Sequence, residues 1–257
     1  MRHDAAFGLI QKSRSTGFIS EQYLNKPELL QQLRTAFQDN GYVKLQEFLT
    51  PDAFRSVSSE VTRLHSARVR KDFVMPDFNT DRKMSVLSGK DVVRQSEIIA
   101  NIYACQELRD WIKSLIGVDI HSVLHDDEFL VVNFLDGERD THGWHLDDPR
   151  YALIIVVESP APHIGGCIEY IPDWKQLALE VGFEPHQNVE RGVEICKLKG
   201  KLRSDILRSS DCYVLDAGEV LHRVSPMSAE GSRKALNLAF DDRRYRVYGE
   251  TATRLYA

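Results

Sequence analysis

The pattern of apolar residues changes at Gly117, and this change constrains the fold more than any other feature of the 257-residue chain. Beyond Gly117 the sequence contains short runs rich in β-branched and aromatic residues, at 129–134, 152–157, 167–171, 212–215 and 235–240. Runs of this length, separated by turn-forming residues, predict β-strands. Helices followed by many strands favour an α+β protein, with an antiparallel barrel or sandwich and helices packed outside it.

The first half of the chain carries helical periodicity. An apolar stripe follows Pro27 and ends before Gly41. This pattern predicts a helix that begins at Pro27 and ends at Gly41. Thr50 precedes a second stripe as an N-cap residue. A third helical stretch covers 92–116, with a break near Cys105.

Residues 66–90 show no sustained period and are rich in charged residues, Ser and Gly, so we predict a long loop there. We expect one domain over 1–257, with a mainly helical part at 1–117, a barrel core at 118–245 and a tail at 246–257.

The bulk composition narrows the range of partners. The net charge of −5 and a pI near 6.0 argue against a nucleic-acid surface, which needs a basic patch. No apolar run reaches the length of a membrane span, about 18 residues. The four cysteines are isolated, which is typical of reduced thiols in a cytoplasmic protein. We expect a small-molecule substrate, no nucleic acid and no membrane, and we leave a homodimer open.

Polar side chains that can bind a metal gather between two of the predicted strands. His145 and Asp147 are two residues apart, so an extended backbone points both to the same side. His222 follows a later strand, and a barrel can bring it back beside them. Two histidines and one carboxylate leave coordination positions open, which suits Fe(II) with a bidentate cosubstrate and O2.

Arg233 adds a site for an anion. It lies 11 residues after His222 (233 − 222), at the start of the last predicted strand. We expect a short turn to bring it beside His222 in the adjacent strand. A guanidinium there can bind a carboxylate through two hydrogen bonds, as the tail of 2-oxoglutarate requires. The His-x-Asp triplet alone is common by chance, so Arg233 decides the interpretation.

The pattern of His145, Asp147, His222 and Arg233 resembles the Fe(II)/2-oxoglutarate-dependent dioxygenase superfamily. This resemblance implies a double-stranded β-helix, a jelly-roll or cupin-like barrel with the N-terminal helices outside. It also implies Fe(II) on the three ligands, 2-oxoglutarate on Arg233, and O2. The layout of the whole chain is similar to the phytanoyl-CoA dioxygenase-like branch.

The stretch 142–149 has a closer resemblance, to the radical halogenases and related hydroxylases that act on free lysine. The resemblance implies that the substrate contacts a set of five residues: Arg82, Glu128, His142, Asp148 and Asn237. An amino acid with two ammonium groups needs buried acceptors, and its carboxylate needs a cation. Glu128 as a solvated strand-edge residue and Arg82 as a loop cation are the alternatives.

Asp147 distinguishes two reactions within that group. Its halogenases carry Gly at this position, so Asp147 implies hydroxylation of L-lysine to 4-hydroxylysine, with succinate and CO2 as coproducts. The alternatives are the same chemistry on another small amine or an acyl substrate, or a non-catalytic cupin-like binding module. Tyr245, Tyr248 and Tyr256 predict either an aromatic lid or a packed tail.

Overall fold

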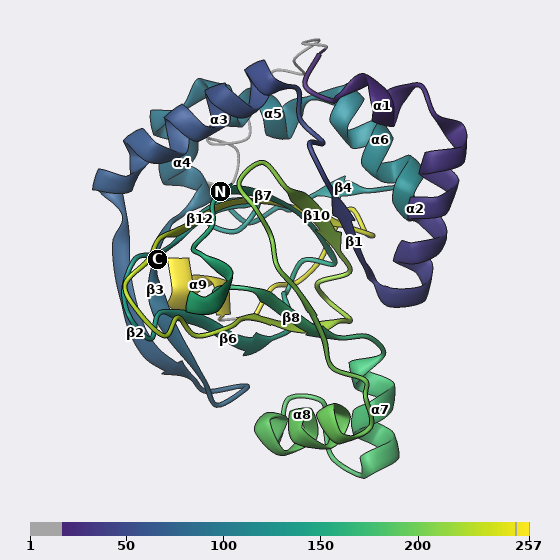
Figure 1. Ribbon diagram of the computed structural model, residues 1–257, viewed down its shortest axis with the longest axis vertical. Coiled ribbons are helices and arrows are strands. Elements are labelled where there is room, and N and C mark those ends of the chain that lie inside the picture. Colours follow the sequence, from purple (N-terminus) through teal and green to yellow (C-terminus); the bar gives the residue numbers. More distant parts are fainter. Residues whose placement is uncertain (1–16, 250, 257) are drawn as a thin grey trace.

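The computed structural model describes residues 17–249 and 251–256. In these ranges a strongly curled sheet lies between two groups of helices (Figure 1). The strands are β1 (Tyr42–Leu45), β2 (Val69–Met75), β3 (Thr80–Leu87), β4 (His121–Ser122), β5 (Leu130–Leu135), β6 (Thr141–His145), β7 (Tyr151–Glu158), β8 (Ile168–Ile171), β9 (Arg203–Asp205), β10 (Cys212–Leu215), β11 (Leu221–Val224) and β12 (Arg233–Asp241).

The strand order is β1-β10-β7-β12-β5-β3-β6-β11-β8-β9, with β2 paired to β3 and β4 paired to β12. All of these pairings are antiparallel. The helices are α1 (Glu21–Leu24), α2 (Pro27–Asn40), α3 (Pro51–Leu64), α4 (Gly89–Gln95), α5 (Glu97–Ala104), α6 (Gln106–Ile116), α7 (Trp174–Val181), α8 (Val189–Leu198) and α9 (Thr251–Tyr256). The prediction of an antiparallel barrel with the N-terminal helices outside it is confirmed (Figure 1).

The helix boundaries follow the sequence signals. Gly41 ends α2 in the left-handed conformation, with φ of 61°, and the side chain of Thr50 accepts a hydrogen bond from Ala53 N at the start of α3. The stretch predicted as a helix over 92–116 is divided twice. Cys105 separates α5 from α6 as expected, and Ser96 also breaks it, because its hydroxyl caps α5 by accepting from Ile99 N.

The prediction of a long loop over 66–90 is wrong. A short 3-10 helix (His65–Ala67) leads into β2, and β2 and β3 form a hairpin whose register runs from Val69 opposite Val86 to Met75 opposite Thr80. The strand period was hidden because one face of β2 is exposed and charged. On β3 the buried face includes Arg82, which occupies a position that sequence patterns assign to an apolar residue.

Two faces of the curled sheet have different roles. The outer face packs against α3, α5 and α6 in the largest apolar cluster, where Tyr103 stacks on Phe240 at 5.3 Å between ring centroids. The inner face carries a smaller apolar cluster and several buried polar side chains, among them His145, His222 and Arg233. Trp144 packs away from His145 beside Trp174 of α7, as the alternation along the strand predicts. Among the residues that the structure describes, no helix is long and apolar enough to cross a membrane.

Gly143 allows β6 to approach β3 closely. A Cβ at this position would lie 2.5 Å from the backbone oxygen of Asp81, so the two strands would have to separate. We expect Gly143→Ala to lower the free energy of unfolding by about 1–3 kcal/mol, the usual cost of overpacking, as measured by urea denaturation. Gly137→Ala is the control, because its Cβ would meet nothing nearer than 3.6 Å. Equal stability of the two variants would contradict this account of the β3–β6 contact.

Candidate metal and cosubstrate site

Two histidines lie directly opposite each other on the inner face of the barrel. The register of β6 and β11 pairs His145 with His222, and their ring centroids are 4.1 Å apart. Both residues are buried, at 5% and 7% exposed. Directly opposed residues of an antiparallel pair project on the same face, so this register alone brings the two imidazoles together.

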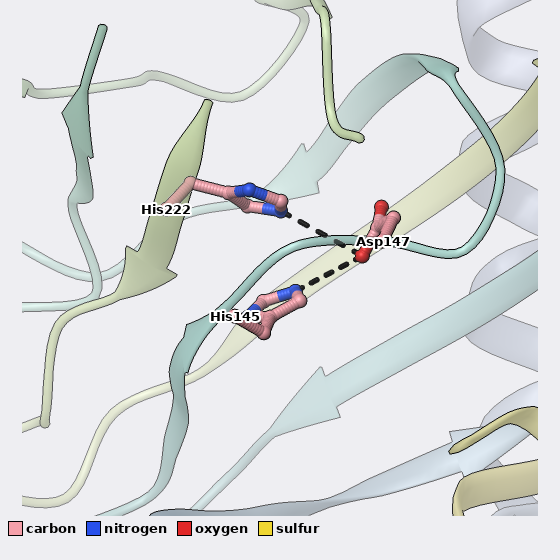
Figure 2. A group of neighbouring side chains, drawn as sticks. All are labelled: His145, Asp147 and His222. Carbon is pink, nitrogen blue, oxygen red and sulfur yellow. Dashed lines mark ion pairs between the residues drawn. The ribbon is translucent and has the colours of Figure 1, made fainter. Parts of the chain in front are cut away.

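Asp147 completes a group of three possible metal ligands. It follows the end of β6, and its Oδ1 lies 3.2 Å from His145 Nε2 and 3.8 Å from His222 Nε2 (Figure 2). One ligand atom from each residue falls within 4.8 Å of the others. Among the described residues, this is the group of histidine, cysteine and acidic side chains with the spacing of a metal site.

Hydrogen bonds orient both imidazoles for coordination. The Nδ1 of His145 lies 2.7 Å from Gly143 O, and the Nδ1 of His222 lies 2.9 Å from Val220 O. A carbonyl can only accept, so each Nδ1 donates, which turns each Nε2 toward the centre of the group, where it can bind a metal ion. Burial, then the charge of His145, lower the pKa of His222 to about 4, so its ring is neutral at physiological pH.

The carboxylate supplies the negative charge. Burial raises the pKa of Asp147, but the hydrogen bond with His145 and the charges of His222 and His145 outweigh it and hold the pKa below its ordinary value. Two imidazole nitrogens and one ionised carboxylate oxygen are the donor set that suits non-haem Fe(II). The residues therefore fit this metal, and other coordination positions remain for further ligands.

Arg233 lines the same pocket as the three possible ligands. It is 2% exposed, and its Nε and Nη2 have no hydrogen-bond partner within the protein. A buried guanidinium with unpaired donors is costly unless an anion binds it. Its position matches the requirement for the distal carboxylate of 2-oxoglutarate.

The predicted route of Arg233 to the site is wrong. We expected it in the strand adjacent to His222, but β11 pairs with β6 and β8, whereas β12 pairs with β4, β5 and β7. Arg233 therefore comes from a different part of the sheet than His222. The curvature of the sheet, and not a hairpin, brings both into one pocket.

Two further polar residues line the pocket and were missed from the sequence. Asn133 on β5 is 9% exposed, and its Oδ1 has no partner. Tyr213 on β10 is 4% exposed; burial raises the pKa of its hydroxyl, which the charge of Arg233 and a hydrogen bond with it partly offset. Each lies inside an otherwise apolar strand run, and a polar residue on the inward face was the signal available.

His142 and Asn237, two of the five expected substrate residues, line this pocket too. The ring of His142 stacks on His145 at 3.9 Å between centroids, and its Nε2 has no partner. Burial, then the charge of His145, hold the pKa of His142 well below its ordinary value. The Oδ1 of Asn237 is also buried without a partner.

Arg82, Glu128 and Asp148 are not among the residues that line this pocket, but they lie close to Asp147. Arg82 is on β3 and 1% exposed, so its interpretation as a loop cation is wrong; burial lowers its pKa to about 10, and its Nε is unpaired. Glu128 lies in the turn before β5 and not in a strand. It is 8% exposed, which rules out a solvated edge residue.

The three tyrosines near the C-terminus differ in their positions. Tyr245 is 77% exposed, and the hydroxyl of Tyr248 donates to Asp241. Tyr256, on α9, packs with the apolar cluster that contains Met84 of β3. Burial, then the charges of Asp147 and Glu128, raise the pKa of Tyr256 well above its ordinary value. Tyr248 and Tyr256 therefore both lie near Glu128, and Tyr256 also lies near Asp147.

Solved structures share this architecture. The chain resembles the non-haem α-ketoglutarate-dependent epimerase SnoN from nogalamycin biosynthesis, with a TM-score of 0.64 and 15% identity, covering 84% of this chain and 82% of SnoN. It also resembles a Pseudomonas putida prolyl-4-hydroxylase (TM-score 0.54, 16% identity, 83% and 99% covered) and EctD from S. alaskensis (TM-score 0.58, 16% identity, 82% and 75% covered). These likenesses confirm the predicted double-stranded β-helix.

The sequence profile of the HalD family, described as Halogenase D, matches residues 25–256. The chain therefore belongs to the HalD family. No curated protein matches the chain at a significant level.

Proposed function

We propose that this chain is an Fe(II)/2-oxoglutarate-dependent hydroxylase of a free cationic amino acid, converting L-lysine to 4-hydroxylysine with succinate and CO2 as coproducts. The observation that carries the proposal is the pocket that holds His145, Asp147 and His222 together with Arg233, whose Nε and Nη2 have no partner in the protein. The structure solved for EctD contains 2-oxoglutarate and 5-hydroxyectoine, which supports hydroxylation of a small amino-acid derivative on this fold.

The residues divide the work between binding and shielding. Bound iron with 2-oxoglutarate and O2 supplies the oxidising power for an unactivated C–H bond. His145, Asp147 and His222 hold the metal, and Arg233 binds the distal carboxylate of 2-oxoglutarate. The apolar side chains in the pocket lining exclude water from the reacting atoms: Ile154, Ile168, Leu215, Val224 and Ala235.

The acidic residues support a cationic substrate. Glu128 Oε2 is buried without a partner, and burial, then the charges of Asp148 and Asp147, raise the pKa of Glu128 well above its ordinary value. Burial also raises the pKa of Asp148. A buried carboxyl beside other acids becomes favourable as an anion when a cation binds to it. We assign the substrate ammonium groups to Glu128 and Asp148, and the substrate carboxylate to Arg82.

The family to which this chain belongs is described as Halogenase D. The carboxylate of Asp147 nevertheless favours hydroxylation over halogenation. In the lysine halogenases that this sequence resembles, Gly opens a metal position for chloride. Here the Asp147 carboxylate lies 3.2 Å from His145 Nε2 and would take that position. With 2-oxoglutarate and O2 also bound, a metal held by all three residues would have no position left for a halide.

Two alternatives remain as test outcomes. An acyl-CoA substrate would place an apolar chain beside the carboxyl groups of Glu128 and Asp148, which an apolar chain cannot pair with. A non-catalytic binding module would not need three metal ligands beside Arg233, whose Nε and Nη2 have no partner in the protein. We place the enzyme in the cytoplasm, because no disulfide joins the four cysteines, all of which lie in the described ranges, and three of them are buried. We also propose that the chain is a single domain.

The proposed reaction predicts a mass change in the substrate. With Fe(II), 2-oxoglutarate and O2, L-lysine should gain one oxygen atom, with one succinate formed for each product. Asp147→Ala should reduce turnover by about 100-fold or more, because removal of a ligand weakens the metal site. Liquid chromatography with mass spectrometry measures both products, with arginine and ornithine as comparison substrates. Wild-type turnover by Asp147→Ala, or succinate formation that no amino acid stimulates, would contradict the proposal.

The raised pKa of Glu128 predicts how affinity depends on pH. In the free protein burial favours the protonated carboxyl, whereas a bound ammonium favours the anion, so binding of L-lysine should release protons. Affinity for L-lysine should therefore increase as the pH rises above the ordinary glutamate pKa of about 4.3. Anaerobic calorimetry with Fe(II) and 2-oxoglutarate measures this.

Two variants test the assignment of that pH dependence. Glu128→Gln should bind L-lysine weakly and lose the pH dependence assigned to residue 128. Asp127→Asn should keep it, because Asp127 is paired with Lys90 at 2.9 Å. A wild-type affinity that falls with rising pH would show that Glu128 does not receive an ammonium.

A further inference from the structure

Asp147 is the one member of the metal triad that no strand holds. His145 is the last residue of β6, and His222 lies within β11, whereas Asp147 follows β6 in a segment without regular secondary structure (Figure 2). Its side chain is 20% exposed, against 7% and 9% for the two histidine side chains. Contacts other than the strand pairing must therefore fix the direction of this carboxylate.

Backbone hydrogen bonds tie the Asp147 segment to the segment that leads into His222. Asp147 N donates to Ala217 O at 2.9 Å, and Gly218 N donates to Arg150 O at 3.0 Å. The two ligand-bearing segments thus run side by side beyond the ends of their strands. These two bonds enclose the four residues from Asp147 to Arg150 on one side.

The side chain of Arg150 forms further hydrogen bonds between the same two segments. Its Nη2 donates to Asp216 Oδ2 and its Nη1 donates to Glu219 Oε1, each at 2.8 Å. Arg150 is three residues after Asp147, and Glu219 is three residues before His222. A planar guanidinium fork fixes direction as well as distance, which a flexible ammonium does not.

The partners of Arg150 are themselves anchored to the body of the protein. Asp216 N donates to the carbonyl of Gly41 at the end of α2, at 2.7 Å. Glu219 also accepts from Lys175 of α7 at 2.8 Å. The backbone N of Arg150 donates to Asp241 Oδ1 at 3.0 Å, and Asp241 is 1% exposed at the end of β12. The side chain and the backbone N of Arg150 therefore join the Asp147 segment to fixed points on three elements.

We propose that Arg150 is a positioning residue for the metal site, which holds the Asp147 carboxylate toward the imidazoles of His145 and His222. Arg150 itself does not contact the metal position, and its effect passes through Asp147. The inference rests on the proposed function, because it assumes that Asp147 is a metal ligand. It adds a link from the helical layers to the metal site that the ligand set alone does not contain.

A double-mutant cycle tests this role. Anaerobic calorimetry with Fe(II) alone gives the metal affinity of the wild type, Arg150→Met, Asp147→Ala and the double variant. We expect Arg150→Met to weaken Fe(II) binding by about 10-fold, as loss of a residue that orients a ligand does. The double variant should bind no more weakly than Asp147→Ala, because Arg150 acts through that carboxylate. A further 10-fold loss in the double variant, or an unchanged Arg150→Met, would overturn the proposal.

Two other variants make the cycle specific. Lys44→Met is the matched control, because Lys44 bridges Asp205 and Asp211 at 3.4 and 3.2 Å away from the triad, and it should leave Fe(II) affinity unchanged. Arg150→Lys keeps the charge without the fork, and it replaces Arg150→Met in the cycle if that variant does not fold. A wild type that binds no Fe(II) would instead overturn the proposed function, and this inference with it.

Discussion

The site depends on one register between two strands. The pairing of β6 with β11 places His145 opposite His222, with a register shift between His222 and Val224. Because side chains alternate across a strand, a slip by one residue would turn one imidazole to the outer face and leave no ligand pair. Asp147 lies two residues after His145, and the hydrogen bond from its backbone N to Ala217 O holds it near both imidazoles. The metal site is thus a consequence of the sheet, completed by one loop.

The buried polar groups of the site lower the stability of the protein. Arg233, Asn133, Asn237 and Glu128 each bury at least one polar atom without a partner in the protein. Such groups cost free energy unless a ligand satisfies them, and the large apolar cluster on the outer face offsets that cost. These atoms include donors of a guanidinium and an acceptor of a carboxyl group, as the proposed anionic cosubstrate and the proposed cationic substrate require.

Strand and helix runs with a clear period were predictable from the sequence, because their apolar faces pack on the outer side of the sheet. The β2–β3 hairpin was not, since its buried face carries Arg82 and its other face is charged. The ligand triplet was visible through residue type and spacing. The sequence did not specify which strands face each other across the barrel. The position of Arg233 near the triad depends on that arrangement, and so do the positions of Asn133 and Tyr213 in the pocket.

The most direct test of the central claim is a crystal structure prepared under argon with Fe(II), 2-oxoglutarate and L-lysine. Our account predicts one iron bound by His145 Nε2, the Asp147 carboxylate and His222 Nε2, with the distal carboxylate of 2-oxoglutarate on Arg233 and a lysine ammonium on Glu128. Iron bound elsewhere, the imidazole of His222 turned away from the other two ligands, or Arg233 paired with a protein carboxylate would contradict it.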